Sequence, residues 1–450
     1  NSSSLTLDTF VIDTTAPTVS SFSMSDTALK SGDTSTVTIV FSEEVAGFSN
    51  DDITVVNGTL STMSSTDDVT WTGTYTPNSN VEDSTNVLTL GTNWTDKAGN
   101  AYAGSAISTA NFTIDTKAPT VSSFSMSDTA LKSGDTSTVT IVFSEEVAGF
   151  SNDDITVVNG TLSTMSSTDD VTWTGTYTPN SNVEDSTNVL TLGTNWTDKA
   201  GNAYAGSAIS TANFTIDTKA PSISAVTQVS TPSNDTTPSY VFTTNEAGTI
   251  TTNITQGISS NTSASVGNNT VTFNTLPEGT YANKTITLTD SAGNSSSLTL
   301  DTFVIDTTAP TISSITVASN NSTTTLAKES NTITFKVGFS ESVTLSTASD
   351  VKVPFTIGGG SELSAIAQST TTATIGGTAY AINFTYTVPG SVNGAIALVT
   401  GELTLANSAT VLDATTNALT GNMSSLTGSV TVDTTAPTIS SITVASNNST

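Results

Sequence analysis

Val69-Thr-Trp-Thr-Gly-Thr-Tyr-Thr76 alternates apolar or small residues with threonine along its whole length. Successive side chains of a β-strand point to opposite faces, so this period of two predicts a strand with one buried face. β-Branched residues are dense in Thr36–Phe41 and again in Ile53–Val56, which favours strands there as well. Turn residues stand between these runs at Asn57-Gly58, Asn78-Ser79-Asn80 and Gly99-Asn100. No helical periodicity of useful length interrupts them, and the predicted fold class is all-β.

The same pattern repeats along the chain. Residues 13–114 recur as residues 115–216 with one difference, in which Thr15 becomes Lys117. Two further units, 217–305 and 306–432, open with the related linkers Asp-Thr-Lys-Ala-Pro and Asp-Thr-Thr-Ala-Pro. Units of this length are too long for solenoid repeats and suit independently folding sandwiches of about seven strands. The extra length of unit 306–432 is expected in added strands or long loops.

Both ends of the sequence duplicate internal segments. Residues 1–12 repeat residues 294–305, and residues 433–450 repeat residues 306–323. We therefore expect residues 1–12 to be the end of a preceding domain and residues 433–450 to be the start of a further one, so that the chain is part of a longer array.

The composition argues against an enzyme. The chain has no His and no Cys, and its ten basic residues are all Lys. Ser-His-Asp and Cys-His catalysis and the usual zinc sites therefore cannot be built. The one Ser-x-x-Lys match, Ser349 to Lys352, lies in a Thr- and Val-rich stretch without a helical pattern that would bring the two side chains together.

The charge restricts the possible partners. A formal net charge of −29 argues against binding nucleic acid or an anionic membrane, because both need clustered basic residues. No apolar run approaches the length of a membrane span. The acidity suits a soluble surface polymer and divalent cations.

Three motifs carry a family resemblance. Phe41-Ser-Glu-Glu-Val-Ala-Gly-Phe48, then Asp51-Asp-Ile53, then Asp96-Lys-Ala-Gly-Asn100, together with the Thr-Ala-Pro linker, resemble the bacterial immunoglobulin-like repeats of giant surface adhesins and biofilm proteins. The resemblance implies tandem Greek-key β-sandwiches, cell adhesion and an extracellular or cell-surface location. Many proteins of this family also hold Ca²⁺ between domains.

The residues give a separate argument for a metal. In an immunoglobulin-like sandwich, the loop after the second strand and the loop before the last strand lie at the pole where the chain enters. Each unit could therefore bring a linker Asp, a Glu and a late-loop Asp together, and Asn side chains could add amide oxygens for Ca²⁺. The candidate ligands are Asp13, Glu43 or Glu44, Asp96 and Asn100; Asp115, Glu145 or Glu146, Asp198 and Asn202; Asp217, Glu246, Asp290 and Asn294; and Asp306, Glu341 and Asp413. The alternative is turn chemistry alone, since Asp-x-Ala-Gly-Asn also makes a good tight turn.

Tryptophans raise the question of a sugar-binding platform. Trp71 lies on the apolar phase of its strand, so we expect it in the core, and no exposed aromatic platform is apparent for a carbohydrate-binding module.

The linkers predict an extended rod. Each is only a few residues long and holds one proline, which restricts its own backbone and that of the preceding Ala: Pro17, Pro119, Pro221, Pro310 and Pro437. Two functions fit such a rod. One is a spacer that holds an adhesive tip away from the cell, with neighbouring domains of the same chain as its partners. The other is a subunit of a fibre, sheath or surface layer, in which identical chains associate laterally or end to end.

Overall fold

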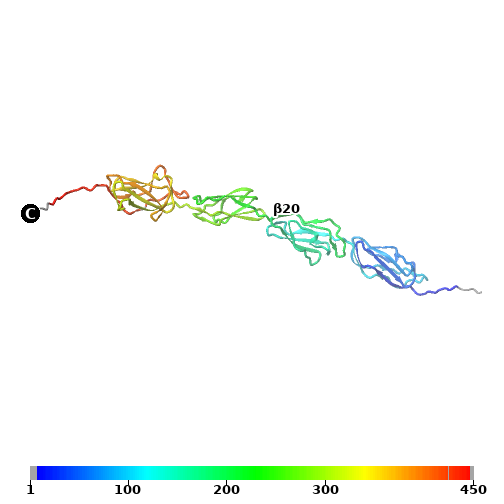
Figure 1. Ribbon diagram of the computed structural model, residues 1–450. Helices are drawn as coiled ribbons and strands as arrows, with labels where there is room; N and C mark the ends of the chain where they lie inside the picture. Colours follow the sequence, from blue (N-terminus) through cyan, green and yellow to red (C-terminus); the bar gives the residue numbers. More distant parts are fainter. Residues whose placement is uncertain (1–7, 424, 446–450) are drawn as a thin grey trace, which may run out of the picture. The chain divides into compact units, whose positions relative to one another are not determined.

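The computed structural model describes residues 8–423 and 425–445. Nearly all of its regular structure is β-strand, and the three 3₁₀ turns are η1 (Asn50–Asp52), η2 (Asn152–Asp154) and η3 (Ala348–Asp350). The all-β prediction is confirmed. The buried hydrophobic side chains form four clusters, each drawn from one continuous stretch of chain. Each sandwich accordingly occupies its own range of colour in Figure 1.

The first domain is a β-sandwich. One sheet has the order β1 (Val19–Met24), β3 (Ser35–Phe41), β7 (Thr70–Pro77), β6 (Gly58–Leu60). The opposite layer consists of short ladders: β2 (Ala28–Lys30), β12 (Phe112–Asp115), β8 (Glu82–Asn86); β11 (Ile107–Ser108), β9 (Thr89–Leu90), β5 (Ile53–Thr54); and β10 (Thr95–Asp96) with β4 (Val45–Ala46).

The alternation in β7 places its residues as predicted. Its threonines at 70, 72, 74 and 76 are exposed, whereas Tyr75 is fully buried and Trp71 packs against the core. Trp71 contacts the ring of Phe48 at 5.0 Å between centroids, so its assignment to the core is correct. The turn predictions also hold, because Asn57, Asn80 and Gly99 all have the positive φ that such turns need.

The second domain repeats this arrangement. Its strands are β13 (Val121–Met126), β15 (Ser137–Phe143), β19 (Thr172–Pro179), β18 (Gly160–Leu162); β14 (Ala130–Lys132), β24 (Phe214–Asp217), β20 (Glu184–Asn188); β17 (Ile155–Thr156), β21 (Thr191–Leu192), β23 (Ile209–Ser210); and β16 (Val147–Ala148), β22 (Thr197–Asp198).

The third domain is shorter but keeps two layers. Its ladders are β25 (Ile223–Thr227), β26 (Ser239–Thr244), β30 (Gly267–Phe273), β28 (Ile258–Ser260); β29 (Ser263–Ala264), β27 (Gly248–Thr252), β32 (Thr285–Thr289), β33 (Ser295–Thr299); and β31 (Gly279–Tyr281), β34 (Phe303–Ile305).

The fourth domain uses its extra residues for added strands. β40 (Leu363–Ala367) pairs with β39 (Val351–Ile357) and with β42 (Thr378–Thr387), so it joins ladders that are separate in the first two domains. β41 (Ala373–Ile375) adds a further strand beside β42. The other strands are β35 (Ile312–Ser319), β36 (Leu326–Ala327), β37 (Thr332–Phe339), β38 (Thr344–Leu345), β43 (Asn393–Leu398), β44 (Thr404–Leu405), β45 (Val411–Leu412), β46 (Leu426–Thr427) and β47 (Thr431–Asp433).

The two terminal segments remain predictions. Residues 1–7 and 446–450 lie outside the described residues, and residues 8–12 and 434–445 carry no strand. A strand needs a neighbour for its hydrogen-bond ladder, and no β-ladder or β-bridge among the described residues includes these segments.

Candidate metal centres

Strand pairing positions two acidic loops of the first domain side by side. β4 pairs with β10 in such a way that Val45 lies opposite Asp96. Glu43 and Glu44 immediately precede β4, so this register brings the glutamates to the loop that begins at Asp96. The same pairing in the second domain sets Val147 opposite Asp198.

A buried turn orients the Asp96 carboxylate. Its Oδ1 accepts a hydrogen bond from the backbone N–H of Asn100 at 2.8 Å, and its Oδ2 accepts one from Asn100 Nδ2 at 2.7 Å. Asp96 is only 1% exposed although it is charged. These hydrogen bonds satisfy part of the carboxylate and fix the direction of its remaining lone pairs.

The linker aspartate is held against this turn. Asn100 Nδ2 also donates to the backbone carbonyl of Asp13 at 3.2 Å, and the N–H of Thr15 donates to Asp13 Oδ1 at 2.9 Å. A few residues later, the N–H of Thr18 donates to Ser42 Oγ, next to Glu43, at 2.9 Å. The linker is therefore attached to both loops.

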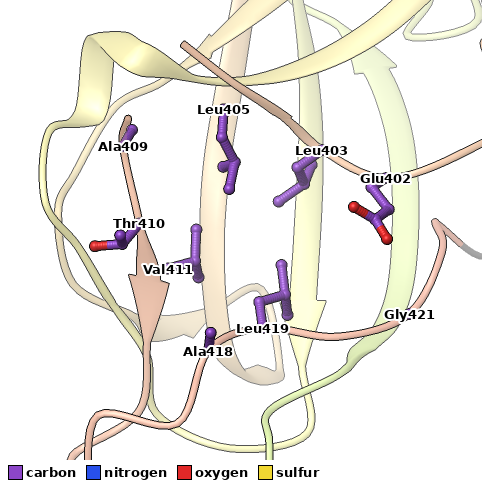
Figure 2. Close-up of a pocket in the computed structure, with 9 residues that line it drawn as sticks. All are labelled: Glu402, Leu403, Leu405, Ala409, Thr410, Val411, Ala418, Leu419 and Gly421. Carbon is purple, nitrogen blue, oxygen red and sulfur yellow. The ribbon is translucent and has the colours of Figure 1, made fainter. Parts of the chain in front are cut away.

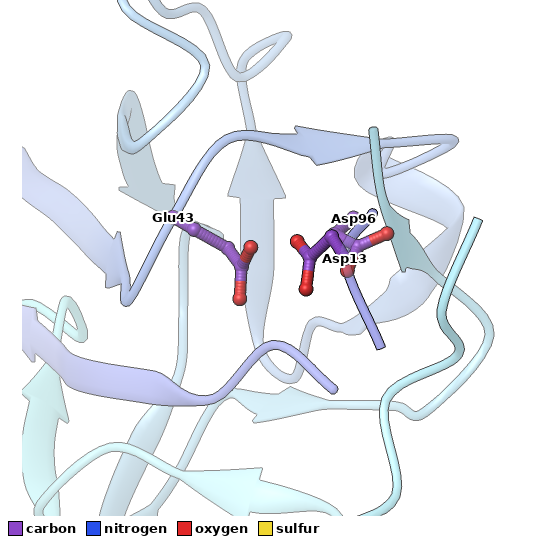
Figure 3. A group of neighbouring side chains, drawn as sticks. All are labelled: Asp13, Glu43 and Asp96. Atoms are coloured by element: carbon purple, nitrogen blue, oxygen red, sulfur yellow. The ribbon is translucent and has the colours of Figure 1, made fainter. Parts of the chain in front are cut away.

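Among the described residues, this arrangement produces three acidic clusters. In each, a linker Asp, a Glu and a late-loop Asp offer carboxylate oxygens that lie within 4.8 Å of one another: Asp13, Glu43 and Asp96; Asp115, Glu145 and Asp198; and Asp306, Glu341 and Asp413. Figure 3 shows the Glu43 carboxylate facing those of Asp13 and Asp96. In each cluster the late-loop Asp is buried and the other two residues are half-buried.

The neighbouring glutamates have other partners. Glu44 pairs with Lys97 at 3.0 Å, and Glu146 pairs with Lys199 at 2.8 Å. Lys97 also binds Asp68 at 2.8 Å. Of the two alternatives that the sequence left open at each position, the structure therefore brings Glu43 and Glu145 into the clusters.

The electrostatics of the clusters are those of crowded carboxylates. Burial, together with the charges of the two neighbouring aspartates, raises the pKa of Glu43, Glu145 and Glu341 above its ordinary value. Burial also tends to raise the pKa of Asp96 and Asp413, but hydrogen bonds from the Asn side chain and loop N–H groups outweigh it and lower both. The clusters of Asp96 and Asp413 thus combine an aspartate whose ionised form is favoured with a glutamate whose ionised form is disfavoured.

The predicted role of the asparagines as amide-oxygen ligands stays a prediction, and the structure shows where their amide nitrogens point. Asn100 and Asn202 turn Nδ2 towards the carboxylate and the linker carbonyl. Asn417 does the same in the fourth domain, where its Nδ2 donates to Asp413 Oδ2 at 2.9 Å and to the carbonyl of Asp306 at 3.0 Å. Sequence reasoning missed Asn417, although its spacing of four residues from Asp413 matches that between Asp96 and Asn100.

The fourth predicted set remains a prediction. Asp217 and Asn294 belong to one compact unit of the chain, and Glu246 and Asp290 belong to the other. Asn294 Nδ2 donates to the carbonyl of Asp217 at 2.9 Å, as at the other linkers.

The donor set of the clusters fits a hard cation. Carboxylates are the only metal-binding side chains in them, and oxygen is the donor that Ca²⁺ and Mg²⁺ prefer. Zn²⁺ and copper favour nitrogen and sulfur ligands, which His and Cys would supply and which this chain lacks.

A small apolar pocket in the fourth domain carries no comparable chemistry. It holds about 90 Å³ and is lined by Glu402, Leu403, Leu405, Ala409, Thr410, Val411, Ala418, Leu419 and Gly421 (Figure 2). Glu402 is its one titratable residue, and no aromatic ring lines it on which a sugar could stack.

Fold and site together define a class of protein: tandem β-sandwiches with an acidic cluster where a linker enters a domain. A family model described as "Bacterial Ig-like domain" matches residues 13–114 and 115–216, and these two units are bacterial Ig-like domains. No curated protein matches the chain. Such domains are typically non-enzymatic structural domains of extracellular or surface proteins. Among the described residues, no helix is long and apolar enough to cross a membrane.

Proposed function

We propose that this chain is a spacer segment of a large cell-surface adhesin, and that Ca²⁺ at the domain junctions stiffens it. The observation that supports the proposal is the position of the linker aspartate. Asp115 is the last residue of β12 in the first domain, and its carboxylate lies among those of Glu145 and Asp198 in the second domain. An ion held there would bind both domains at once.

The charge of each cluster favours such an ion. Three carboxylates within 4.8 Å repel one another, and this repulsion adds to the effect of burial in raising the pKa of the glutamate. A divalent cation replaces repulsion by attraction and ties the linker to both loops. Backbone carbonyls and water would complete the six to eight oxygens that Ca²⁺ usually takes.

The surface is consistent with a spacer. Among the described residues of the four domains, the exposed large hydrophobic side chains are aliphatic except for Tyr380. They are spread over several strands and loops, as on an ordinary soluble surface. With no His or Cys in the chain, we also infer that the segment has no catalytic role.

Calorimetric titration of the full chain with Ca²⁺ tests the metal. We expect Glu145→Gln to remove one binding equivalent relative to the parent, because it takes a carboxylate from one cluster. Glu146→Gln is the matched control: its carboxylate pairs with Lys199 outside the cluster, so the number of equivalents should not change.

The increase in melting temperature on adding Ca²⁺ should likewise be smaller in Glu145→Gln than in the parent, and unchanged in Glu146→Gln. At a hundredfold excess of Ca²⁺ over its dissociation constant, a site that exists only in the folded state adds about 2.7 kcal/mol. A parent chain that takes up no Ca²⁺, or a loss of binding that is equal in the two variants, would show that these acids are turn and surface residues.

A further inference from the structure

The asparagine of each late loop faces two domains. Asn202 Nδ2 donates to Asp198 Oδ2 and to the carbonyl of Asp115, both within its own domain and linker. Its Oδ1 accepts a hydrogen bond from the backbone N–H of Ser31, in the first domain, at 2.8 Å. One amide group therefore connects the late loop, the linker and the preceding domain.

The two near-identical domains provide an internal comparison. Asn100 occupies the same loop in the first domain, where no described domain lies against it, and it is half-buried. Asn202 is 4% exposed. A Cβ added to Gly99 would meet nothing within 4 Å, whereas one added to Gly201 would lie 3.0 Å from Lys30 Nζ of the first domain. The contact with the preceding domain is therefore what buries this loop.

The contact recurs with different donors. The N–H of Ser133 donates to Asn294 Oδ1 at 3.1 Å within the first compact unit of the chain. In the second unit the donor is a side chain, since Asn234 Nδ2 lies 3.4 Å from Asn417 Oδ1 and 3.3 Å from Thr416 Oγ1. The acceptor is the asparagine Oδ1 at all three junctions. The donor is a serine backbone N–H at the first two and the side-chain amide of Asn234 at the third.

We propose that this asparagine is an interdomain latch that acts without a metal ion. Its amide nitrogen holds the late loop to the linker, and its amide oxygen holds the preceding domain, so the angle between successive domains is restrained even when no ion is bound. The latch consists of hydrogen bonds made by the asparagine, whereas the proposed Ca²⁺ site consists of three carboxylates. The late-loop aspartate takes part in both.

The turn that supplies the Ser31 donor permits a selective test. The N–H of Asp33 donates to the carbonyl of Lys30 at 3.1 Å, and Gly32 has φ +89°. These are the features of a type II turn with Ser31 at its second position, where proline is favoured. Ser31→Pro therefore removes the N–H donor and preserves the turn, and Ser31→Ala is the matched control that keeps the donor.

The experiment measures the distance between two spin labels in the full chain with the metal chelated. The chain contains no cysteine, so Thr59→Cys and Thr161→Cys, both at exposed positions, would label the first and second domains uniquely. We expect Ser31→Pro to broaden the distance distribution relative to the parent and Ser31→Ala to leave it unchanged. An unchanged width in Ser31→Pro overturns the latch.

A second junction covers the possibility that Ser31→Pro impairs folding. Asn234→Ala removes the side-chain donor between the third and fourth domains, and labels at Ser260→Cys and Thr404→Cys report on that junction. The distribution should again broaden, and a width equal to that of the parent would contradict the proposal. Because chelator is present throughout, failure to bind Ca²⁺ in the titration would leave this result unaffected.

Discussion

Protonation of the glutamates in the three clusters should have two effects on stability. It should stabilise the chain when Ca²⁺ is absent, and it should reduce the stabilisation that Ca²⁺ provides. The pKa of Glu43, Glu145 and Glu341 is raised above 4.5 in the folded chain, so their ionised form is disfavoured there relative to the unfolded chain. This penalty is fully present above the raised pKa and is relieved as the pH falls through it towards 4.5. Asp96 and Asp413, whose pKa is lowered, lose their contribution only below 3.8, outside this window.

We therefore predict that the chelated chain melts at a higher temperature at about pH 5 than at about pH 7. The increase in melting temperature on adding Ca²⁺ should shrink over the same interval, because protons compete for the glutamates. Melting curves at both pH values, with chelator and with Ca²⁺, measure both effects. A Ca²⁺ increment that does not change with pH would exclude these glutamates as ligands.

At the scale of elements, an aromatic pair holds the late loop at both ends. Trp196 precedes Asp198, Tyr204 follows Asn202, and the two rings stack at 4.6 Å between centroids with 17° between their planes. Trp196 Nε1 donates to the carbonyl of Gly193, and the N–H of Tyr204 donates to the carbonyl of Trp196. The side chain of Trp196 is 1% exposed. The acidic cluster of the second domain is thus positioned by the core beneath it.

Trp196→Ala should destabilise the second domain by about 3–5 kcal/mol, because it removes a large, fully buried side chain. Trp173→Ala is the control, since Trp173 is only partly buried and lies far from Asp198 in the sequence. Calorimetry of the full chain should show one transition shifted strongly by the first change and less by the second. Equal shifts of the unfolding transition in the two variants would mean that the burial of the tryptophan does not determine the loss of stability.

Some of these elements could be predicted from the sequence and some could not. Alternation identified β7, and the spacing of Asp13, Glu43 and Asp96 anticipated that their side chains would meet, because strand order at the entry pole is set by the fold. Spacing does not say which of two adjacent loop residues turns inward, so Glu43 and Glu44 could not be separated. Nor does it say which atom of an amide faces a carboxylate, and hence the donor role of Asn202 became visible only in three dimensions.

The fourth domain shows a further limit. Asp413-Ala-Thr-Thr-Asn417 lacks the Ala-Gly of the other late loops, so the motif does not point to Asn417. The structure supplies a different support for the same turn, in which both the N–H and the Oγ1 of Thr415 donate to Asp413 Oδ1 at 2.8 Å. Thr415 thus keeps the geometry of the turn by supplying other hydrogen-bond donors, although the Ala-Gly sequence motif is lost.

For the whole molecule, the short proline-containing linkers predict an extended rod. A sandwich of typical strands is about 40 Å long, so four in line give a maximum dimension of about 160 Å. Small-angle scattering of the full chain should find this dimension and a monomer at high concentration, with a stiffer particle in Ca²⁺ than in chelator. A compact particle would contradict the rod, and concentration-dependent association would favour the fibre subunit over the spacer.

The parallel pairing of the first and last parts of a domain bears on what happens when the chain is pulled. β2 lies beside β12 in parallel, as β14 lies beside β24 and β36 beside β47. Tension on the two ends of a domain draws such neighbours in opposite directions along their common axis. Their hydrogen bonds are then sheared together instead of being opened one after another, as they would be in a hairpin pulled from its open end. The first, second and fourth domains thus have a strand arrangement that resists extension, which is the mechanical property that the proposed spacer function would require.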